Sequence, residues 1–197
     1  MNRNRLAVVV FTVALFTAAF AATASANAVG TMEVYGGYAK SSTEMAPPSE
    51  TLGGGLTFGA GYYRNLAATT MWGVEAAYDN LGSKDWDDGL GGTGTTSASM
   101  FRVSPQFRLN FGAPVGPSFF GQAGFGYYNV SASVEDNTTG VTTDASDGKF
   151  GFNIGAGVGF PVGPKTKLSF SGNYHSVSTE VESTNYLNVR AGLGFGL

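Results

Sequence analysis

The chain has 197 residues, no cysteine, and 11 Lys and Arg residues against 14 Asp and Glu residues, which gives a formal net charge of −3. This balance argues against a nucleic-acid partner, because binding to phosphate backbones requires clustered Lys and Arg. The absence of cysteine excludes disulfide bonds, and the length is that of one domain.

The first residues have the pattern of a secretory signal peptide. A positive segment, Met1–Arg5, precedes an apolar stretch, Leu6–Ala22, and the small residues Ala24–Ala26 offer a cleavage site. We therefore expect residues 1–26 to be removed on export and residues 27–197 to form a single domain. An uncleaved membrane anchor is the alternative interpretation of the same segment.

Beyond the signal peptide, apolar side chains recur at every second residue, which predicts β-strands. Each run provides the roughly 9 to 11 residues that a tilted strand needs to cross a membrane. The eight runs are Thr31–Lys40, Gly54–Tyr63, Met71–Asn80, Met100–Phe111, Ser118–Ser131, Gly148–Phe160, Thr166–Ser176 and Asn188–Leu197.

The breaks between these runs alternate in length. Long polar breaks cover residues 41–53, 81–97, 132–147 and 177–185, whereas shorter ones cover residues 64–70, 112–117 and 161–165. Short turns at one rim and long loops at the other are typical of a bacterial outer-membrane barrel. The predicted fold is therefore all-β, an eight-stranded antiparallel up-and-down transmembrane β-barrel with both termini at the short-turn rim.

The last strand indicates which face lies outward. Val189, Leu193, Phe195 and Leu197 alternate with Arg190 and with glycines. Glycine could hardly build the water-facing surface of a soluble protein, so we expect the apolar faces to contact lipid and the opposite faces to line the lumen. Aromatic residues also close the ends of several apolar faces, as girdles at the two membrane boundaries do.

Charged residues of the strands fall on the lumen-facing side. An Arg or Lys facing hydrocarbon at mid-membrane would cost about 2 to 4 kcal/mol. The predicted lumen network consists of Glu33, Glu75, Arg102, Arg108 and Arg190, with Phe120 and Tyr128 crossing a lumen that is lined elsewhere by glycine. We interpret it as a structural salt-bridge network, because an eight-stranded barrel is only wide enough for side chains to fill it. An ion pathway is the alternative.

Taken together, the signal peptide, the eight alternating strands and the apolar positions of the last strand resemble the small eight-stranded outer-membrane proteins. This group includes the outer-membrane protein A barrel, outer-membrane protein X and the opacity-type proteins. The resemblance implies a Gram-negative outer-membrane location, contact with outer-membrane lipid and lipopolysaccharide, and a monomer without a cofactor. It also implies a terminal signal, Leu193, Phe195 and Leu197, that the barrel-assembly machinery reads, although the family usually ends in Phe rather than Leu.

The function implied by the resemblance is structural or surface-interactive, in envelope integrity or adhesion, through four long loops that meet an extracellular ligand or host surface. A small porin, a lipid A-modifying hydrolase and a secreted soluble β-sandwich are the alternatives. The hydrolases pair a His with a Ser two residues later, but here His175 is followed at that spacing by Val177. We therefore expect no enzyme. We also expect no metal site, because the acidic loops lack the ligand spacing of calcium loops.

Overall fold

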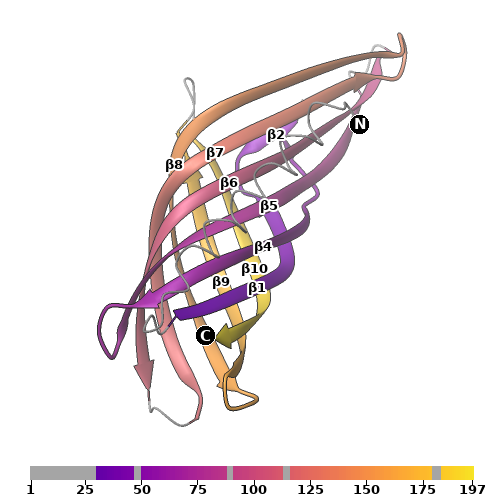
Figure 1. Cartoon of the computed structure of the whole chain (residues 1–197). Helices are drawn as coiled ribbons and strands as arrows, with labels where there is room; N and C mark the ends of the chain where they lie inside the picture. The colour runs from indigo at the N-terminus through magenta and orange to yellow at the C-terminus, as the bar shows by residue number, and fades with distance from the viewer. Residues whose placement is uncertain (1–29, 47–49, 88–90, 113–115, 179–182) are drawn as a thin grey trace.

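A computed structural model describes residues 30–46, 50–87, 91–112, 116–178 and 183–197, so the predicted signal peptide lies outside the described residues. Within these ranges no helix is long and apolar enough to cross a membrane. The strands, shown in Figure 1, are β1 (Gly30–Ser41), β2 (Glu44–Ala46), β3 (Glu50–Thr51), β4 (Gly55–Asn65), β5 (Thr70–Asp87), β6 (Thr93–Gly112), β7 (Ser118–Asp136), β8 (Val141–Pro161), β9 (Thr166–Val177) and β10 (Thr184–Gly196).

Eight of these strands close into one barrel in the order β1-β10-β9-β8-β7-β6-β5-β4, while β2 and β3 form a separate small hairpin. The antiparallel pairing of β1 with β10 joins the first and last strands of the barrel, with Met32 opposite Phe195. At the same seam the backbone N–H of Leu197 donates to the carbonyl of Gly30 at 2.9 Å. The predicted eight-stranded up-and-down barrel is confirmed, and its closure leaves no free edge along the barrel wall.

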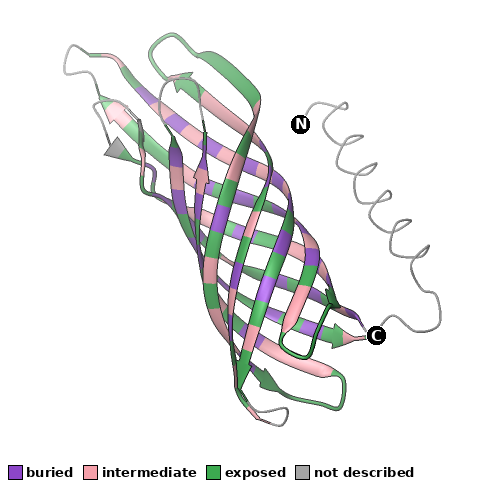
Figure 2. Ribbon diagram, turned by 90° about the vertical axis from the view of Figure 1, so that its left-hand side faces the viewer, coloured by how far each residue is buried: buried purple, intermediate pink, exposed green. Residues whose placement is uncertain are grey.

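Side chains alternate between the two faces along the barrel strands (Figure 2). Large apolar residues point outward, with Phe125 68% and Phe150 73% exposed. Polar residues point inward and are buried, as predicted. Glycine on the inner face makes room for large lumen groups, because a Cβ at Gly157 would overlap the ring of Phe120.

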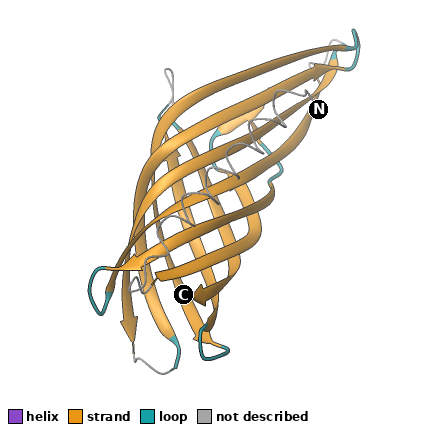
Figure 3. Cartoon of the chain, viewed as in Figure 1, coloured by secondary structure: helices purple, strands orange, loops and turns teal. Residues whose placement is uncertain are grey.

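Four strands are longer than the sequence predicted. The polar breaks expected as loops at residues 81–97 and 132–147 are for the most part strand, because β5, β6, β7 and β8 continue beyond the barrel as a sheet (Figure 3). The prediction failed because Ser, Thr, Gly and Asp are typical of turns, yet here their backbones pair from strand to strand, with one bulge in β5 between Asn80 and Gly82. We call this extension, residues 80–87, 93–99, 129–136 and 141–149, the ribbon.

The outward faces of the strands change from apolar to polar where the barrel becomes the ribbon. The inward row formed by Ala98, Ala132 and Ala145 is apolar, whereas the neighbouring outward row contains Ser99, Ser131 and Ser146. The next inward row, Lys84, Thr96, Val134 and Thr143, is mixed, whereas in the barrel the outward residues are apolar. The change on the outward face marks the level at which the medium around the strands changes from hydrocarbon to water.

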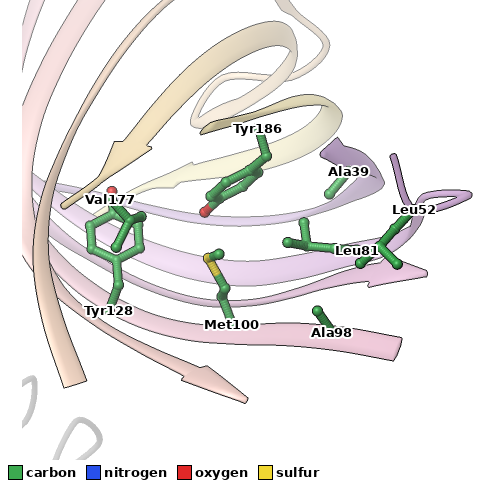
Figure 4. Packing of buried hydrophobic residues seen from close by; sticks show 8 residues of the cluster. All are labelled: Ala39, Leu52, Leu81, Ala98, Met100, Tyr128, Val177 and Tyr186. Atoms are coloured by element: carbon green, nitrogen blue, oxygen red, sulfur yellow. The ribbon is translucent and has the colours of Figure 1, made fainter. Parts of the chain in front are cut away.

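The hairpin β2–β3 leads to a residue that packs over the barrel mouth. Leu52, directly after β3, is fully buried in an apolar cluster (Figure 4) made of Ala39, Leu52, Leu81, Ala98, Met100, Tyr128, Val177 and Tyr186. A bulge in β5 at Gly82, with φ of 86°, receives this segment, since the N–H of Gly54 donates to the carbonyl of Leu81 at 2.9 Å. A Cβ at Gly82 would lie 2.5 Å from the nitrogen of Gly54, so only glycine permits this approach.

The tip of the ribbon between β7 and β8 is a tight turn. One carboxylate oxygen of Asp136 accepts from the backbone N–H of Thr138 at 2.8 Å and of Thr139 at 3.1 Å, and Gly140 has a positive φ of 69°. The hydrogen bonds from Thr139 and Thr138 lower the pKa of Asp136. The turn therefore holds β7 and β8 in register to their ends.

Candidate functional site

The centre of the lumen is occupied by one carboxylate between two arginines. Glu75 on β5 accepts from Arg102 on β6 at 3.1 Å and from both terminal nitrogens of Arg190 on β10 at 3.0 and 2.9 Å. Two tyrosine hydroxyls, those of Tyr35 and Tyr63, also donate to it. All lone pairs of the carboxylate thus have partners, as a charge removed from water requires.

A second carboxylate lies closer to the ribbon end. Asp79 lies four residues beyond Glu75 on the same face of β5, and it accepts from Nε of Arg102 at 3.1 Å and from the hydroxyl of Tyr186 at 2.8 Å. Thr57 on β4 donates to its other oxygen at 2.5 Å. Arg102 therefore bridges two carboxylates and links two levels of the lumen.

A third ion pair lies toward the short-turn rim. Arg108 donates to Glu33 at 2.8 Å, and Ser169 donates to the other oxygen of Glu33 at 2.6 Å. The guanidinium carbon of Arg108 lies 3.9 Å from the ring centroid of Tyr63 and 4.4 Å from that of Phe120. These two ring faces stabilise the guanidinium group of Arg108, which is shielded from water, through cation–π contacts.

Neutral polar side chains connect the ion pairs along the opposite wall. Gln122, which accepts from Arg108, donates to Asn173 at 2.8 Å, and Asn173 donates to Asn188 at 3.1 Å. Asn188 contacts Nε2 of His175 at 3.2 Å, and the Nδ1 of that ring lies 3.2 Å from the hydroxyl of Tyr128. This series of hydrogen bonds extends from the short-turn end of the lumen to the apolar cluster at its mouth.

The structure places all five predicted lumen residues inside the barrel and brings them together in two groups: Glu75 with Arg102 and Arg190, and Glu33 with Arg108. The residues predicted from the sequence did not include Asp79, although it lies an even number of positions from Glu75 and therefore on the same inner face of the strand. With Asp79 included, three buried carboxylates match three buried guanidinium groups. The formal charges of these six groups therefore cancel.

His175 has the surroundings of a structural residue. It is 1% exposed, its ring stacks on Tyr186 with centroids 4.4 Å apart, and its two nitrogens contact Tyr128 and Asn188. Val177, not a serine, shares its inward face. A nucleophile activated by histidine requires a hydroxyl or thiol within hydrogen-bond reach and a path for the substrate. The hydroxyl that contacts His175 is the phenol of Tyr128, and both side chains are buried in the packed lumen. Among the described residues there is also no cluster of His, Asp and Glu that could hold a metal ion.

The terminal strand presents its predicted residues outward. Leu193, Phe195 and Leu197 are 41%, 41% and 62% exposed on the outer face of β10, while Arg190 points inward from the same strand. Phe195 lies opposite Thr166 of β9 on one side and Met32 of β1 on the other. These side chains therefore flank the seam at which the barrel closes.

An apolar outer wall, a charge-balanced lumen and a closed sheet define an integral β-barrel of the outer-membrane type. The model of the family described as outer membrane protein beta-barrel domain matches residues 11–197. The chain belongs to this outer-membrane β-barrel family. No curated protein matches the sequence.

Solved structures with the same fold come from several bacteria. Neisserial surface protein A is 13% identical with a TM-score of 0.62, and the match covers 85% of this chain and 97% of that chain. The N-terminal β-barrel domain of Pseudomonas aeruginosa OprF is 15% identical with a TM-score of 0.54, covering 87% and 98%. A major outer membrane protein of Thermus thermophilus is 13% identical with a TM-score of 0.56, covering 85% and 99%. At these identities the likeness is one of fold.

Replacing Glu75 by Gln should destabilise the barrel strongly, because Arg102 and Arg190 would remain buried without their shared counter-charge. We expect a loss of about 3 to 5 kcal/mol in the free energy of unfolding, measured by urea titration of the barrel in detergent micelles. The control is Asp147→Asn, which breaks the pair with Lys149 at 2.6 Å, in which Asp147 is 65% exposed. That change should cost less than about 1 kcal/mol. Equal losses in the two variants would contradict the central role of Glu75.

Proposed function

We propose that the protein is a surface-interaction protein of the outer membrane, in which a sealed barrel anchors the ribbon outside the cell. The observation that carries this proposal is the continuation of β5–β8 far beyond the barrel, with polar outward faces suited to water. Outer-membrane barrels place their short turns in the periplasm and their long connections outside. In this orientation the ribbon and the hairpin β2–β3 face the exterior. Export through residues 1–26 and a monomeric state are parts of the same proposal.

The lumen supports an anchoring role rather than a transport role. Arg102, Glu75 and Arg190 cross its centre in direct contact with one another. Above them, Leu52 and Met100 are fully buried within the apolar cluster. An ion would have to displace both a fully hydrogen-bonded charge network and an apolar layer.

The ribbon supports the interaction role. Beyond the point where β9 ends, the outer edge of β8 runs on from Val141 to Lys149, and residues 141–147 are exposed. The ribbon thus offers two sheet faces and an edge to other molecules without any change in the barrel. The proposal therefore includes two roles, envelope integrity through the barrel in the membrane and adhesion through the ribbon above it.

Shortening the ribbon tests the proposal directly. The pairs Ser83 with Ser97 and Ser133 with Asp144 lie opposite each other across the sheet, so each pair can be joined by a two-residue Asn-Gly turn. The shortened chain keeps the apolar cluster and the lumen network and should still show heat-modifiable gel migration. Bacteria carrying it should attach to cultured epithelial cells several-fold less than bacteria carrying equal amounts of the full chain. Equal attachment would contradict an interaction role for the ribbon.

Conductance separates this proposal from a small porin. The intact barrel in a planar lipid bilayer should give no stable open channels, because side chains fill an eight-stranded barrel. A larger porin in the same bilayer is the positive control. Stable currents from the folded chain would favour the porin alternative over the sealed anchor.

We further propose that Leu193, Phe195 and Leu197 form the signal for the barrel-assembly machinery. Leu197→Phe restores the residue with which this family usually ends, and it should leave assembly unchanged or improve it. The measurement is the fraction of heat-modifiable protein in outer membranes after induced expression. Phe195→Ala is the counterpart and should reduce that fraction. A marked loss of assembly in Leu197→Phe would exclude this interpretation of the terminal strand.

A further inference from the structure

One edge of the ribbon is a strand without a neighbour. The pairing of β8 with β9 ends at Gly151 and Val177, whereas β8 continues to Val141 as the outermost strand of the ribbon (Figure 1). Among the residues that the structure describes, no strand pairs with this side of β8 beyond that point. We call residues 141–148 the open edge.

The backbone groups of β8 alternate in direction along the open edge. Ser178 donates its N–H to the carbonyl of Phe150 at 3.0 Å, so the backbone groups of Phe150 point toward the β9 side. In an antiparallel sheet the N–H and C=O of one residue point to the same side, and that side changes from each residue to the next. The register of β8 with β7 is continuous through residues 141–159. The residues whose backbone groups face the open edge are therefore Thr142, Asp144, Ser146 and Gly148.

The opposite edge of the ribbon, along β5, is covered by the segment that follows β3. Gly53 donates its N–H to the carbonyl of Ser83 at 3.3 Å, and Gly54 donates to the carbonyl of Leu81 at 2.9 Å. Natural sheets commonly protect their edges by such a covering segment, or by Lys, Pro or a bulge. The open edge contains neither Lys nor Pro, and its pairing with β7 has no bulge. It is therefore suited to accept a further strand.

The outward side chains beside the open edge are anionic. Asp144 is exposed, and its carboxylate has no hydrogen bond or ion pair with any residue that the structure describes. Glu135 on β7 and Asp85 on β5 share this face, and the register across the ribbon places no Lys or Arg on it. A strand added at the open edge would be stabilised by a cationic side chain opposite Asp144.

The inward side chains of the same edge favour a different residue type. Val141, Thr143 and Ala145 are exposed on the inward face, and Val134 of β7 lies beside them. Val141 is 58% exposed and Val134 39% exposed. Because β-branched side chains pack well on such a pleated surface, an added strand would be stabilised by Val, Ile or Thr on this side.

A hollow of about 340 Å³ lies next to Asp144 on the outward face. Its lining includes Ser131 and Ser133 of β7, and Ser133 lies directly opposite Asp144. Serine hydroxyls and a carboxylate can all accept hydrogen bonds from an ammonium or guanidinium group. Neighbouring strands lie about 4.8 Å apart, so a Lys or Arg side chain on an added strand can extend past Asp144 toward these hydroxyls.

We propose that the open edge binds an extended basic segment of another protein, which joins the ribbon as a fifth strand. Lys or Arg side chains of the segment face Asp144 and the hollow, and β-branched side chains alternate with them and face Val141 and Thr143. Each edge residue offers one backbone donor and one acceptor. The inference rests on the proposed function, since the ribbon must lie outside the cell, and it names the kind of partner that the ribbon meets there.

A labelled peptide tests strand addition directly. The probe is Lys-Thr-Lys-Val-Lys-Thr-Lys-Val-Lys with a fluorophore at its N-terminus, and its anisotropy is followed as folded barrel in micelles of dodecyl maltoside is added. We expect saturable binding. With the Lys side chains outward, the amides of the Lys residues face the open edge and those of Thr and Val face away. N-methylation of the Lys amides should therefore weaken binding at least about tenfold, whereas N-methylation of the Thr and Val amides should not.

Proline substitutions remove donors from the edge itself. Thr142→Pro with Ser146→Pro eliminates two N–H groups that face the open edge and that do not pair with β7, a position at which sheets tolerate proline. The matched control, Thr142→Ala with Ser146→Ala, loses the same side chains but keeps both N–H groups. Both variants should keep heat-modifiable gel migration, and only the proline variant should bind the probe roughly tenfold more weakly. Asp144→Asn should weaken binding several-fold at low ionic strength and little at high ionic strength.

Three results would overturn the proposal. Equal binding of the two N-methylated peptides would mean that charge alone attracts the probe. Equal binding of the probe by the proline and alanine variants would exclude the backbone of the open edge as the site. A dimer of the unaltered chain in micelles that the proline variant alone abolishes would assign the edge to a second copy of this chain.

Failure of this inference can be told apart from failure of the proposed function. The chain has no cysteine, so Asn137→Cys at the ribbon tip provides a single site for a membrane-impermeant maleimide on intact cells. Labelling of the cells together with no binding of the probe would overturn only the strand addition. Absence of labelling on cells that carry folded barrel would overturn the external placement of the ribbon and the proposed function with it.

Discussion

The contact on which the rest of the structure depends is the one between Glu75 and its two arginines. The outer wall of the barrel faces hydrocarbon, so every charge on the membrane-spanning strands must lie inside, where each ion loses most of its hydration. Glu75 provides the counter-charge both for Arg102 on β6 and for Arg190 on β10. Because those strands lie on opposite sides of the ring, the same contact joins distant walls across the lumen.

Asp79 shows why the balance must be counted over the whole lumen. The five residues predicted from the sequence carry two negative and three positive charges, which would leave one buried cation without a partner. Asp79 supplies the missing carboxylate and binds Arg102 from the ribbon side. Asp79 is the penultimate residue of the predicted strand Met71–Asn80, but the predicted set of lumen residues did not include it. The alternation of faces had nevertheless already assigned it to the lumen, so charge balance was a usable signal.

Alternation predicts the face of a residue but not its partner. Parity along each strand was sufficient for the eight barrel strands, for the inward set and for the outward terminal residues. The pairing of Glu33 with Arg108 depends on register between strands that are far apart in sequence, and no local pattern records it. The ribbon escaped prediction for a different reason. Thr93, Thr95 and Ser97 have the composition of a loop, and what makes them a strand is their pairing with β5 and β7.

The change of the outward faces from apolar in the barrel to polar in the ribbon links the fold to the proposed roles. Strands β6, β7 and β8 carry Phe101, Tyr127 and Phe150 outward at one level and serine hydroxyls outward at the next, and their backbone pairing continues between the two levels. A flexible loop above the membrane would have to be ordered by each ligand, at a cost in conformational entropy. A sheet continued from the barrel is already ordered by strands that the lumen network and the lipid hold in place. Rigidity that originates in buried ion pairs is thereby transmitted to a water-facing surface, where it can serve recognition.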